Sequence, residues 1–266
     1  KETITSSQNK YIKHIKSLHL KKHRDQLGQY IIEGFKLIEE ALEYKKPFYL
    51  LLLSENAFKS EEGSALVSRF EEADIPIYIG SDKIFADVSE MDTPQGVLAV
   101  MHKGEQELNA VIDTLGVNMI ILDSVRDPGN VGTIIRTADA CGLNAVVLSN
   151  GCVDLYNGKT IRATMGSMFH IPVFTDVDIL ELIEKLKIIN VAVLGADPHS
   201  SLSCIDVGAT DSTAIIIGNE ANGLRDEVKA ITTQNITIPM PGKAESLNAG
   251  IAAAILMYEF AVRRKI

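Results

Sequence analysis

Short runs rich in Val and Ile, alternating with helical patterns, constrain this fold more than any other feature of the sequence. In the second half of the chain, such runs fall at Met119–Leu122, Ala145–Leu148, Val191–Leu194, Ala214–Ile217 and Ile236–Ile238. Helical patterns occur at Val131–Cys141, Ile179–Leu186, Leu224–Thr232 and, closing the chain, Leu247–Arg264. Apolar runs of this kind suit a parallel sheet that is covered on both faces. We therefore predict an α/β fold with a mostly parallel sheet.

The first part of the chain shows the same alternation on a smaller scale. Strand patterns fall at Gln29–Gly34, Tyr49–Leu53, Ile75–Ile79 and Gly96–Met101, and helical patterns at Ser6–Arg24, Lys36–Tyr44 and Ser64–Ala73. A chain of 266 residues exceeds the usual size of one domain, and Lys103–Gly116 is polar and weakly patterned. We predict two α/β domains, at residues 1–103 and 117–266, joined by a linker at 104–116.

Charge is distributed unevenly along the chain. The net charge is −9, yet residues 1–25 hold seven Lys or Arg residues against two acidic ones. Besides Lys1, the basic residues of this segment are Lys10, Lys13, Lys16, Lys21, Lys22 and Arg24. They form either a solvated helix face or an arm that contacts the phosphates of a nucleic acid.

Several classes of protein are disfavoured by the sequence. No apolar run approaches the length of a membrane-spanning helix, and the polar first residues do not resemble a secretory signal. We therefore expect a cytoplasmic protein without membrane contact. The three cysteines lie far apart with no CxxC pair. His19 and His23 are one helical turn apart, but the basic residues around them would repel a cation, so we expect no bound metal.

Three segments of the second domain carry residues suited to ligand binding. In the first, a strand ends at Asp123, a Pro-Gly turn follows, and a helix begins near Asn130, where backbone amides can bind an anion. The second, Gly218–Gly223, follows a buried strand directly, and its glycines allow a close approach of backbone to ligand. Glu220 then lies at the carboxyl end of a strand, where ligands of α/β proteins bind.

The third segment begins at Ile236 and continues into the closing helix. Two prolines end the strand, and we expect Ser246 to cap the helix. The small residues Ala252–Ala254 would let another backbone pack closely against this helix. Each segment, taken alone, is also typical of an ordinary turn between a strand and a helix.

Together, the three segments resemble the motifs of the SpoU/TrmH family of RNA 2'-O-ribose methyltransferases, in the SPOUT superfamily. Asn130, Gly132 and Arg136 match N-x-G-x-x-x-R, and Gly218–Gly223 matches G-N-E-x-x-G. Ile238-Pro239-Met240 and Ser246-Leu247-Asn248 match the third motif. The resemblance covers about residues 117–264. The first domain resembles the L30e-like RNA-binding domain that precedes many such enzymes, through Ile4–Ser6, Asn9-Lys10, Glu33-Gly34 with Leu37, and Thr93–Gly96.

The resemblance implies a trefoil knot near the C-terminus that forms a site for S-adenosylmethionine, although knots are rare among proteins. The residues that it assigns to the cofactor site are Gly195, Ala196, Gly218, Asn219, Ile238, Met240 and Leu247. It also implies a homodimer that pairs through the knotted domain. The helices at Leu247–Arg264 and Val131–Cys141 would form part of that interface.

Catalysis is assigned by the same resemblance to Arg136, Asn130, Glu220, Ser246 and Asn248. A guanidinium stays protonated in water and is therefore a poor base. We expect Arg136 to bind the phosphate beside the target ribose and to stabilise the alkoxide that forms. Asn130 and Glu220 would position Arg136 and the ribose, while Ser246 and Asn248 would organise the surrounding loop.

The sequence leaves three functions open. The resemblance favours methyl transfer to a ribose 2'-hydroxyl of structured RNA, and the large N-terminal domain favours 23S rRNA as that RNA. The alternatives are the same reaction on tRNA, and a catalytically inactive RNA-binding assembly factor that keeps the fold.

Overall fold

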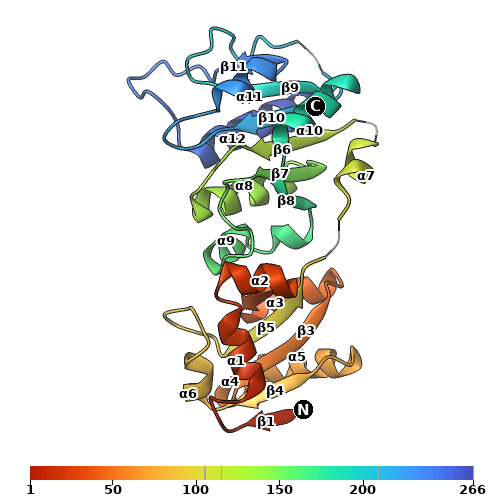
Figure 1. The fold of residues 1–266 in the computed structure, drawn as a ribbon, viewed down its shortest axis with the longest axis vertical. Coiled ribbons are helices and arrows are strands. Elements are labelled where there is room, and N and C mark those ends of the chain that lie inside the picture. The colour runs from red at the N-terminus through yellow and green to blue at the C-terminus, as the bar shows by residue number, and fades with distance from the viewer. Residues whose placement is uncertain (105, 115, 209, 266) are drawn as a thin grey trace. The chain divides into compact units, whose positions relative to one another are not determined.

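The computed structural model describes residues 1–104, 106–114, 116–208 and 210–265 of the chain. The chain divides into two compact units, each with its own sheet (Figure 1). The first comprises Lys1–Glu105 and Tyr156–Ile161, and the second comprises Gln106–Leu155 and Arg162–Ile266. The division falls within helix α9 (Gly158–Thr164).

The first unit is a five-stranded sheet of order β1-β4-β3-β5-β2, in which β5 runs antiparallel to both neighbours. Its strands are β1 (Glu2–Ile4), β2 (Gln29–Glu33), β3 (Phe48–Ser54), β4 (Ile77–Gly80) and β5 (Val97–His102). Its helices are α1 (Lys10–Ser17), α2 (Lys21–Leu27), α3 (Phe35–Glu43), α4 (Glu55–Lys59), α5 (Glu61–Glu72) and α6 (Asp82–Ala86). Leu50 and Leu52 of β3 pack in one core with residues of α1 and α6, whereas Leu51 and Leu53 are buried on the opposite face.

The basic segment forms two helices instead of the single helix predicted over Ser6–Arg24. α1 ends at Ser17 and α2 begins at Lys21. Arg24 is buried, and its guanidinium donates hydrogen bonds to the carbonyls of Leu18 (2.7 Å) and His19 (2.8 Å). These bonds satisfy carbonyl groups that the end of α1 leaves without helical partners. Arg24 therefore has a structural role, and its burial argues against the predicted contact with RNA.

The second unit contains a six-stranded parallel sheet of order β11-β9-β10-β6-β7-β8, which confirms the predicted fold class. Its strands are β6 (Asn118–Leu122), β7 (Ala145–Ser149), β8 (Val173–Val177), β9 (Ala192–Ala196), β10 (Thr213–Ile217) and β11 (Gln234–Ile236). The strand predicted at Ile236–Ile238 ends two residues early. Thr237 pairs instead with Leu202 and Ser203, in the loop that follows β9.

Helices cover both faces of this sheet. They are α7 (Leu108–Ile112), α8 (Pro128–Ala140), α10 (Ile179–Ile188), α11 (Asp226–Ile231) and α12 (Ala249–Met257), with a short 3-10 turn at Ser167–Phe169. Met119 and Ile121 of β6 share a core with Leu182 and Ile183 of α10. On the other face, α8 and α12 contact each other, and α12 contacts β10 (Figure 1). The carboxyl ends of β9, β10 and β11 thus lie beside the start of α12.

The stretch predicted as a linker, 104–116, contains helix α7. Ile112 is buried in the core of the second unit, so this part of the stretch belongs to that unit. Positions 105 and 115 of the predicted linker lie outside the described residues.

The closing helix is shorter than the predicted Leu247–Arg264. α12 ends at Met257, followed by a π-helical turn (Tyr258–Val262) and a 3-10 turn (Arg263–Lys265). Glu259 in the π-helical turn accepts hydrogen bonds from Arg263 and Arg264. Arg264 also donates to the carbonyl of Cys204 at 2.7 Å. These bonds fix the last turns of the chain to the loop that follows β9.

Candidate active site

A cavity of about 530 Å³ lies at the carboxyl ends of β9, β10 and β11. The last residues of these strands, Ala196, Ile217 and Ile236, line it, and α12 contributes Ala249 and Ala252. Small organic ligands bind in pockets of roughly 300–1,000 Å³. In α/β sheets, the carboxyl ends of the strands are also where such ligands bind. The cavity therefore has the size and the position of a ligand site.

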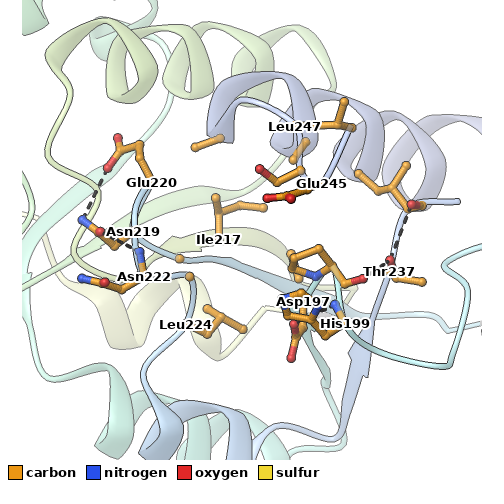
Figure 2. A pocket seen from close by; sticks show the side chains of 18 of the residues that line it. Asp197, His199, Ile217, Asn219, Glu220, Asn222, Leu224, Thr237, Glu245 and Leu247 are labelled. Atoms are coloured by element: carbon orange, nitrogen blue, oxygen red, sulfur yellow. Dashed lines mark hydrogen bonds between the residues drawn. The ribbon is translucent and has the colours of Figure 1, made fainter. Parts of the chain in front are cut away.

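The loop Gly218–Gly223 forms one end of this cavity (Figure 2). The backbones of Asn219 and Gly223 exchange two hydrogen bonds, of 3.0 and 2.8 Å. A Cβ atom on Gly218 would lie 2.2 Å from the carbonyl carbon of Gly223, and Gly223 has a φ of +68°. Both positions therefore require glycine. The Asn219 amide donates to the carbonyl of Ser124 at 2.8 Å, which ties the loop to the end of β6.

The carboxylate of Glu220 joins this loop to the start of α8. It accepts hydrogen bonds from the backbone N–H groups of Arg126 (3.3 Å) and Asp127 (3.2 Å) and from Nδ2 of Asn130 (3.0 Å). A carboxylate is favourable at the N-terminal end of a helix. Burial raises the pKa of Glu220, but the hydrogen bonds from Asn130 and the backbone outweigh it, so the pKa lies below its usual value. At neutral pH this group is an acceptor and has no proton to donate.

We expect Glu220→Gln to destabilise the protein at neutral pH and to lose that effect in acid. A carboxyl whose pKa is lowered by folding contributes stability above its unfolded value of about 4.3, and this contribution disappears as the pH falls through the folded value. Chemical denaturation at a series of pH values measures the difference in free energy of unfolding. Glu62→Gln on α5, whose carboxylate makes no hydrogen bond within the described chain, is the control. If the difference in free energy of unfolding between wild type and Glu220→Gln stays constant below about pH 4.3, this account is contradicted.

Asn130 links Glu220 to the third motif. Its Nδ2 donates to Glu220, and its Oδ1 accepts a hydrogen bond from Nδ2 of Asn248 at 2.9 Å. Oδ1 of Asn248 in turn accepts from the N–H groups of Gly250 (2.8 Å) and Ile251 (3.2 Å) at the start of α12. A continuous chain of side-chain hydrogen bonds therefore joins the three sequence motifs beside the cavity.

The cap of α12 is Asn248, not the predicted Ser246. Both residue types cap helices well, but only Asn248 accepts hydrogen bonds from the first N–H groups of α12. Ser246 is exposed and lines the cavity two residues earlier. Its hydroxyl is therefore free of a capping role.

Most of the predicted cofactor residues line the cavity. The predicted site residues found there are Ala196, Gly218, Asn219, Ile238, Met240 and Leu247, with Glu220, Ser246 and Asn248 from the catalytic set. Gly195 is not among the lining residues. A Cβ atom at Gly195 would lie 2.6 Å from Oδ1 of Asn235 and 2.9 Å from Cδ1 of Leu224. Gly195 therefore serves close packing inside the unit, and its position does not support a cofactor contact.

Arg136 lies outside the cavity, on the exposed side of α8. It makes no hydrogen bond or ion pair with any residue that the structure describes. Gly132, in the same motif, serves packing instead, because a Cβ atom there would lie 2.2 Å from Cβ of Ala163 and would keep α8 from approaching α9. The structure thus brings Asn130, Glu220 and Asn248 together and leaves the guanidinium of Arg136 in solvent.

Several ionisable side chains of the cavity were not predicted from the sequence: Asp197, His199, Lys229 and Glu245. Figure 2 shows Asp197 and His199 at the end of the cavity away from Glu220. Nζ of Lys229 pairs with Oδ2 of Asp197 at 3.0 Å. Burial raises the pKa of Asp197, but the His199 N–H and Lys229 outweigh it, so the pKa lies below its usual value. Asp197 could have been predicted as a site residue, because it directly follows β9 and the carboxyl ends of strands carry ligand contacts.

The described residues hold neither a metal-binding cluster nor a membrane-spanning helix. Across residues 1–104, 106–114, 116–208 and 210–265, no group of three or more His, Cys, Asp or Glu side chains is placed to hold a metal ion. His19 contacts the carbonyl of Val88 at 2.9 Å and the carboxylate of Glu90 at 3.0 Å. In the same ranges, no helix is both long and apolar enough to cross a membrane.

Comparison with known families identifies the class of protein that this fold and site define. Residues 118–258 match the SpoU rRNA methylase family, and residues 9–99 match the MRM3-like substrate-binding domain. The chain therefore belongs to the SpoU rRNA methylase family. The resemblance inferred from the three motifs is confirmed.

Individual relatives match almost the whole chain. It is 39% identical over 255 residues to the 23S rRNA (guanosine(2553)-2'-O)-methyltransferase RlmP of Bacillus subtilis, which covers 96% of this chain and 97% of that protein. It is 29% identical to a 23S rRNA (uridine(2479)-2'-O)-methyltransferase of Streptomyces viridochromogenes, with coverages of 91% and 85%. The AdoMet-bound rRNA methyltransferase from Sinorhizobium meliloti is similar in structure, with a TM-score of 0.87 at 29% identity over 99% of this chain and 98% of that one.

Proposed function

We propose that this chain transfers a methyl group from S-adenosylmethionine to a ribose 2'-hydroxyl of 23S rRNA. The observation that carries the proposal is the chain of hydrogen bonds from Glu220 through Asn130 to Asn248, which joins the three motifs beside one cavity. Relatives named as 23S rRNA 2'-O-methyltransferases support rRNA over tRNA, because they match both units of the chain. The complete set of hydrogen bonds favours an active enzyme over an inactive assembly factor.

The cavity fits S-adenosylmethionine in size and in chemistry. Ile238, Met240 and Leu247 offer apolar surface for the adenosine. Glu245 adds a carboxylate, and the ion pair of Asp197 with Lys229 adds one charge of each sign, which suits a ligand with a sulfonium, an ammonium and a carboxylate group. When bound, S-adenosylmethionine supplies an activated methyl group. Because protein groups alone would hold it, we expect binding to be unaffected by a chelator.

The residues beside the cavity would act mainly by orientation, since holding two reactants in line supplies much of the rate of such a transfer. Glu220 and Asn130 fix the starts of α8 and α12 relative to the cavity. The exposed guanidinium of Arg136 would bind the phosphate beside the target ribose and stabilise the alkoxide. Ser246 and Asn248 would order the loop that precedes α12.

Transfer of labelled methyl groups tests this proposal. Purified protein is incubated with labelled S-adenosylmethionine and either a 23S rRNA transcript or tRNA, with and without a chelator, and the nucleosides are then separated. We expect the label in a 2'-O-methylated nucleoside, in equal amount with the chelator. Label in a base, or in tRNA but not in rRNA, would contradict the proposal.

We propose that the lysines of α1 and α2 bind RNA phosphates. Lys10, Lys13, Lys16, Lys21 and Lys22 are all exposed. Lys16 lies 3.8 Å from the carboxylate of Asp87, and Lys21 lies 3.0 Å from that of Asp25. Lys13 and Lys22 make no ion pair within the described chain. These two lysines therefore offer charge that no protein carboxylate neutralises.

Replacing Lys13 and Lys22 with Ala should weaken RNA binding and flatten its salt dependence. Each lost phosphate contact lowers the log–log slope by roughly 0.7–0.9. Turnover at saturating RNA should change little, because such contacts bind ground state and transition state alike. The charge-matched control replaces Lys185 and Lys187 on α10. If the variant at Lys13 and Lys22 shows an unchanged salt dependence of RNA binding, the basic segment is a solvated helix face and does not contact RNA.

We propose that the protein is a homodimer that pairs through α12 and α8. α12 and the turn after it expose an apolar stripe of Ile251, Ile255 and Tyr258, which are 52%, 40% and 54% exposed. Spacings of four and three residues place these side chains on one face. A continuous apolar face of this kind marks an interaction surface.

Light scattering should give a mass twice the 29.0 kDa of one chain. Ile255→Glu should dissociate the dimer, because it buries an unpaired charge in the interface. Ile188→Glu, at a residue that is 79% exposed at the end of α10, should leave the mass unchanged. A wild-type protein that is monomeric at micromolar concentration would contradict the proposal.

We further propose that the C-terminal segment carries the trefoil knot implied by the family motifs. Two contacts with the loop after β9 support it: the pairing of Thr237 with Leu202 and the bonds from Arg264 to the carbonyls of Cys204 and Val207. With rRNA as its substrate, the enzyme would act in the cytoplasm.

A further inference from the structure

Tyr49 interrupts an otherwise regular strand of the first unit. In the pairing of β3 with β5, Phe48 lies opposite Met101 and Leu50 lies opposite Val100, so Tyr49 is an extra residue without a partner. Such a β-bulge re-aims a side chain. The leucines that follow are fully buried, whereas Tyr49 is 36% exposed. The bulge thus brings one aromatic ring to the surface.

Two imidazole rings flank the ring of Tyr49. Its centroid lies 5.4 Å from that of His14 on α1 and 5.6 Å from that of His102 at the end of β5. Nε2–H of His14 donates to Oε1 of the buried Gln29 at 2.7 Å, which fixes that imidazole. Tyr49 is therefore held between neighbours, and a preordered ring loses little freedom when a ligand binds.

Further aromatic and basic groups lie on α1 and on the neighbouring strand β4. The rings of Tyr11 and Tyr78 are 4.2 Å apart, and Nζ of Lys10 lies 4.8 Å from the ring centroid of Tyr11. Lys10 and His14 are four residues apart and share one face of α1. Proteins that bind single-stranded nucleic acid combine such groups: bases stack on aromatic rings and cations contact the phosphates.

We propose that Tyr49, His14 and His102 form a stacking subsite for an unpaired RNA base, with Lys10 beside it to contact the phosphate. This proposal rests on the proposed function. It adds a contact that depends on an unpaired base, whereas the lysines contact only the phosphates. Bases inside a regular RNA helix are already stacked on one another and offer no free face, so the subsite selects loops or single strands.

Binding of the full-length protein to two probes tests the subsite: a short oligo(A) strand and a fully paired RNA duplex of the same length. Tyr49→Leu keeps apolar bulk but removes the ring. We expect it to weaken binding of the strand about 5- to 150-fold, with little change for the duplex and an unchanged salt slope. Tyr49→Phe should bind as wild type. His102→Ala, at an exposed strand end, should weaken binding of the strand in the same way.

Tyr44→Leu is the matched control, because Tyr44 is another exposed tyrosine of the same unit. The affinity for S-adenosylmethionine should stay constant in all variants because the cavity lies in the second unit, and the affinity for the duplex reports on the fold of the first unit. Equal binding by Tyr49→Leu and wild type, or an equal loss for strand and duplex, overturns the subsite. So does a loss in Tyr49→Phe as large as that in Tyr49→Leu. If these variants still bind and methylate a 23S rRNA transcript normally, the proposed function stands without the subsite; wild-type protein that binds no RNA overturns both.

Discussion

Arg136→Ala should abolish methyl transfer while leaving the affinity for S-adenosylmethionine nearly unchanged. The side chain lies outside the cavity and is exposed on α8, so its proposed work is on the RNA and not on the cofactor. Removing one group that stabilises developing negative charge costs roughly a hundred- to thousand-fold in kcat. Steady-state kinetics on a 23S rRNA transcript measure the loss, and calorimetry measures the cofactor affinity.

Two further variants sharpen this test. Arg136→Lys keeps the charge but loses the planar fork that binds phosphate in two places, so we expect activity between those of wild type and Arg136→Ala. Arg69→Ala, at an exposed position on α5, should be fully active. If Arg136→Ala loses as much affinity for S-adenosylmethionine as it loses activity, Arg136 contributes to cofactor binding and the account is contradicted.

Gly218→Ala should destabilise the second unit and weaken cofactor binding by at least about tenfold. The new Cβ would lie 2.2 Å from the carbonyl carbon of Gly223 and 2.3 Å from the backbone nitrogen of Leu224, and backbone atoms cannot move aside as a flexible side chain would. The loop that carries Asn219 and Glu220 must therefore shift. Overpacking of this kind costs about 1–3 kcal/mol. Denaturant unfolding and calorimetry measure the two effects.

Gly242→Ala is the matched control, because a Cβ at Gly242 meets no atom within 4 Å. It lies in the same motif as Ile238 and Asn248, so both substitutions fall near the cavity. We expect wild-type stability and cofactor affinity. Equal behaviour of the two alanine variants would contradict the tight geometry described for the Gly218–Gly223 loop.

Features set by local sequence were predicted well. The strand predicted at Ala214–Ile217 matches β10 to within one residue, because a run of Ile residues is a local signal. The requirement for glycine at positions 218 and 223 also follows from a local loop. The predicted cap of α12 was wrong, because Ser and Asn both cap helices well and the sequence does not show that Asn248 accepts the hydrogen bonds from Gly250 and Ile251.

Features that depend on pairing between distant residues could not be predicted. Arg24 looked like part of a basic face, and only its hydrogen bonds to Leu18 and His19 show that it holds two helices together. The ion pair of Asp197 with Lys229 joins residues that are far apart in the sequence. The exposure of Tyr49 depends on the register between β3 and β5, which the sequence of β3 alone does not specify.

Mapping of ribose methyl groups in 23S rRNA, by mass spectrometry, tests the proposed activity most directly. The rRNA would come from a strain that lacks this protein and from the same strain complemented with wild type or with Arg136→Ala. The account predicts that one 2'-O-methyl group is missing from the deletion strain, returns with wild type and stays missing with Arg136→Ala. Identical maps in all strains, or the loss of a base methyl group instead, would contradict it.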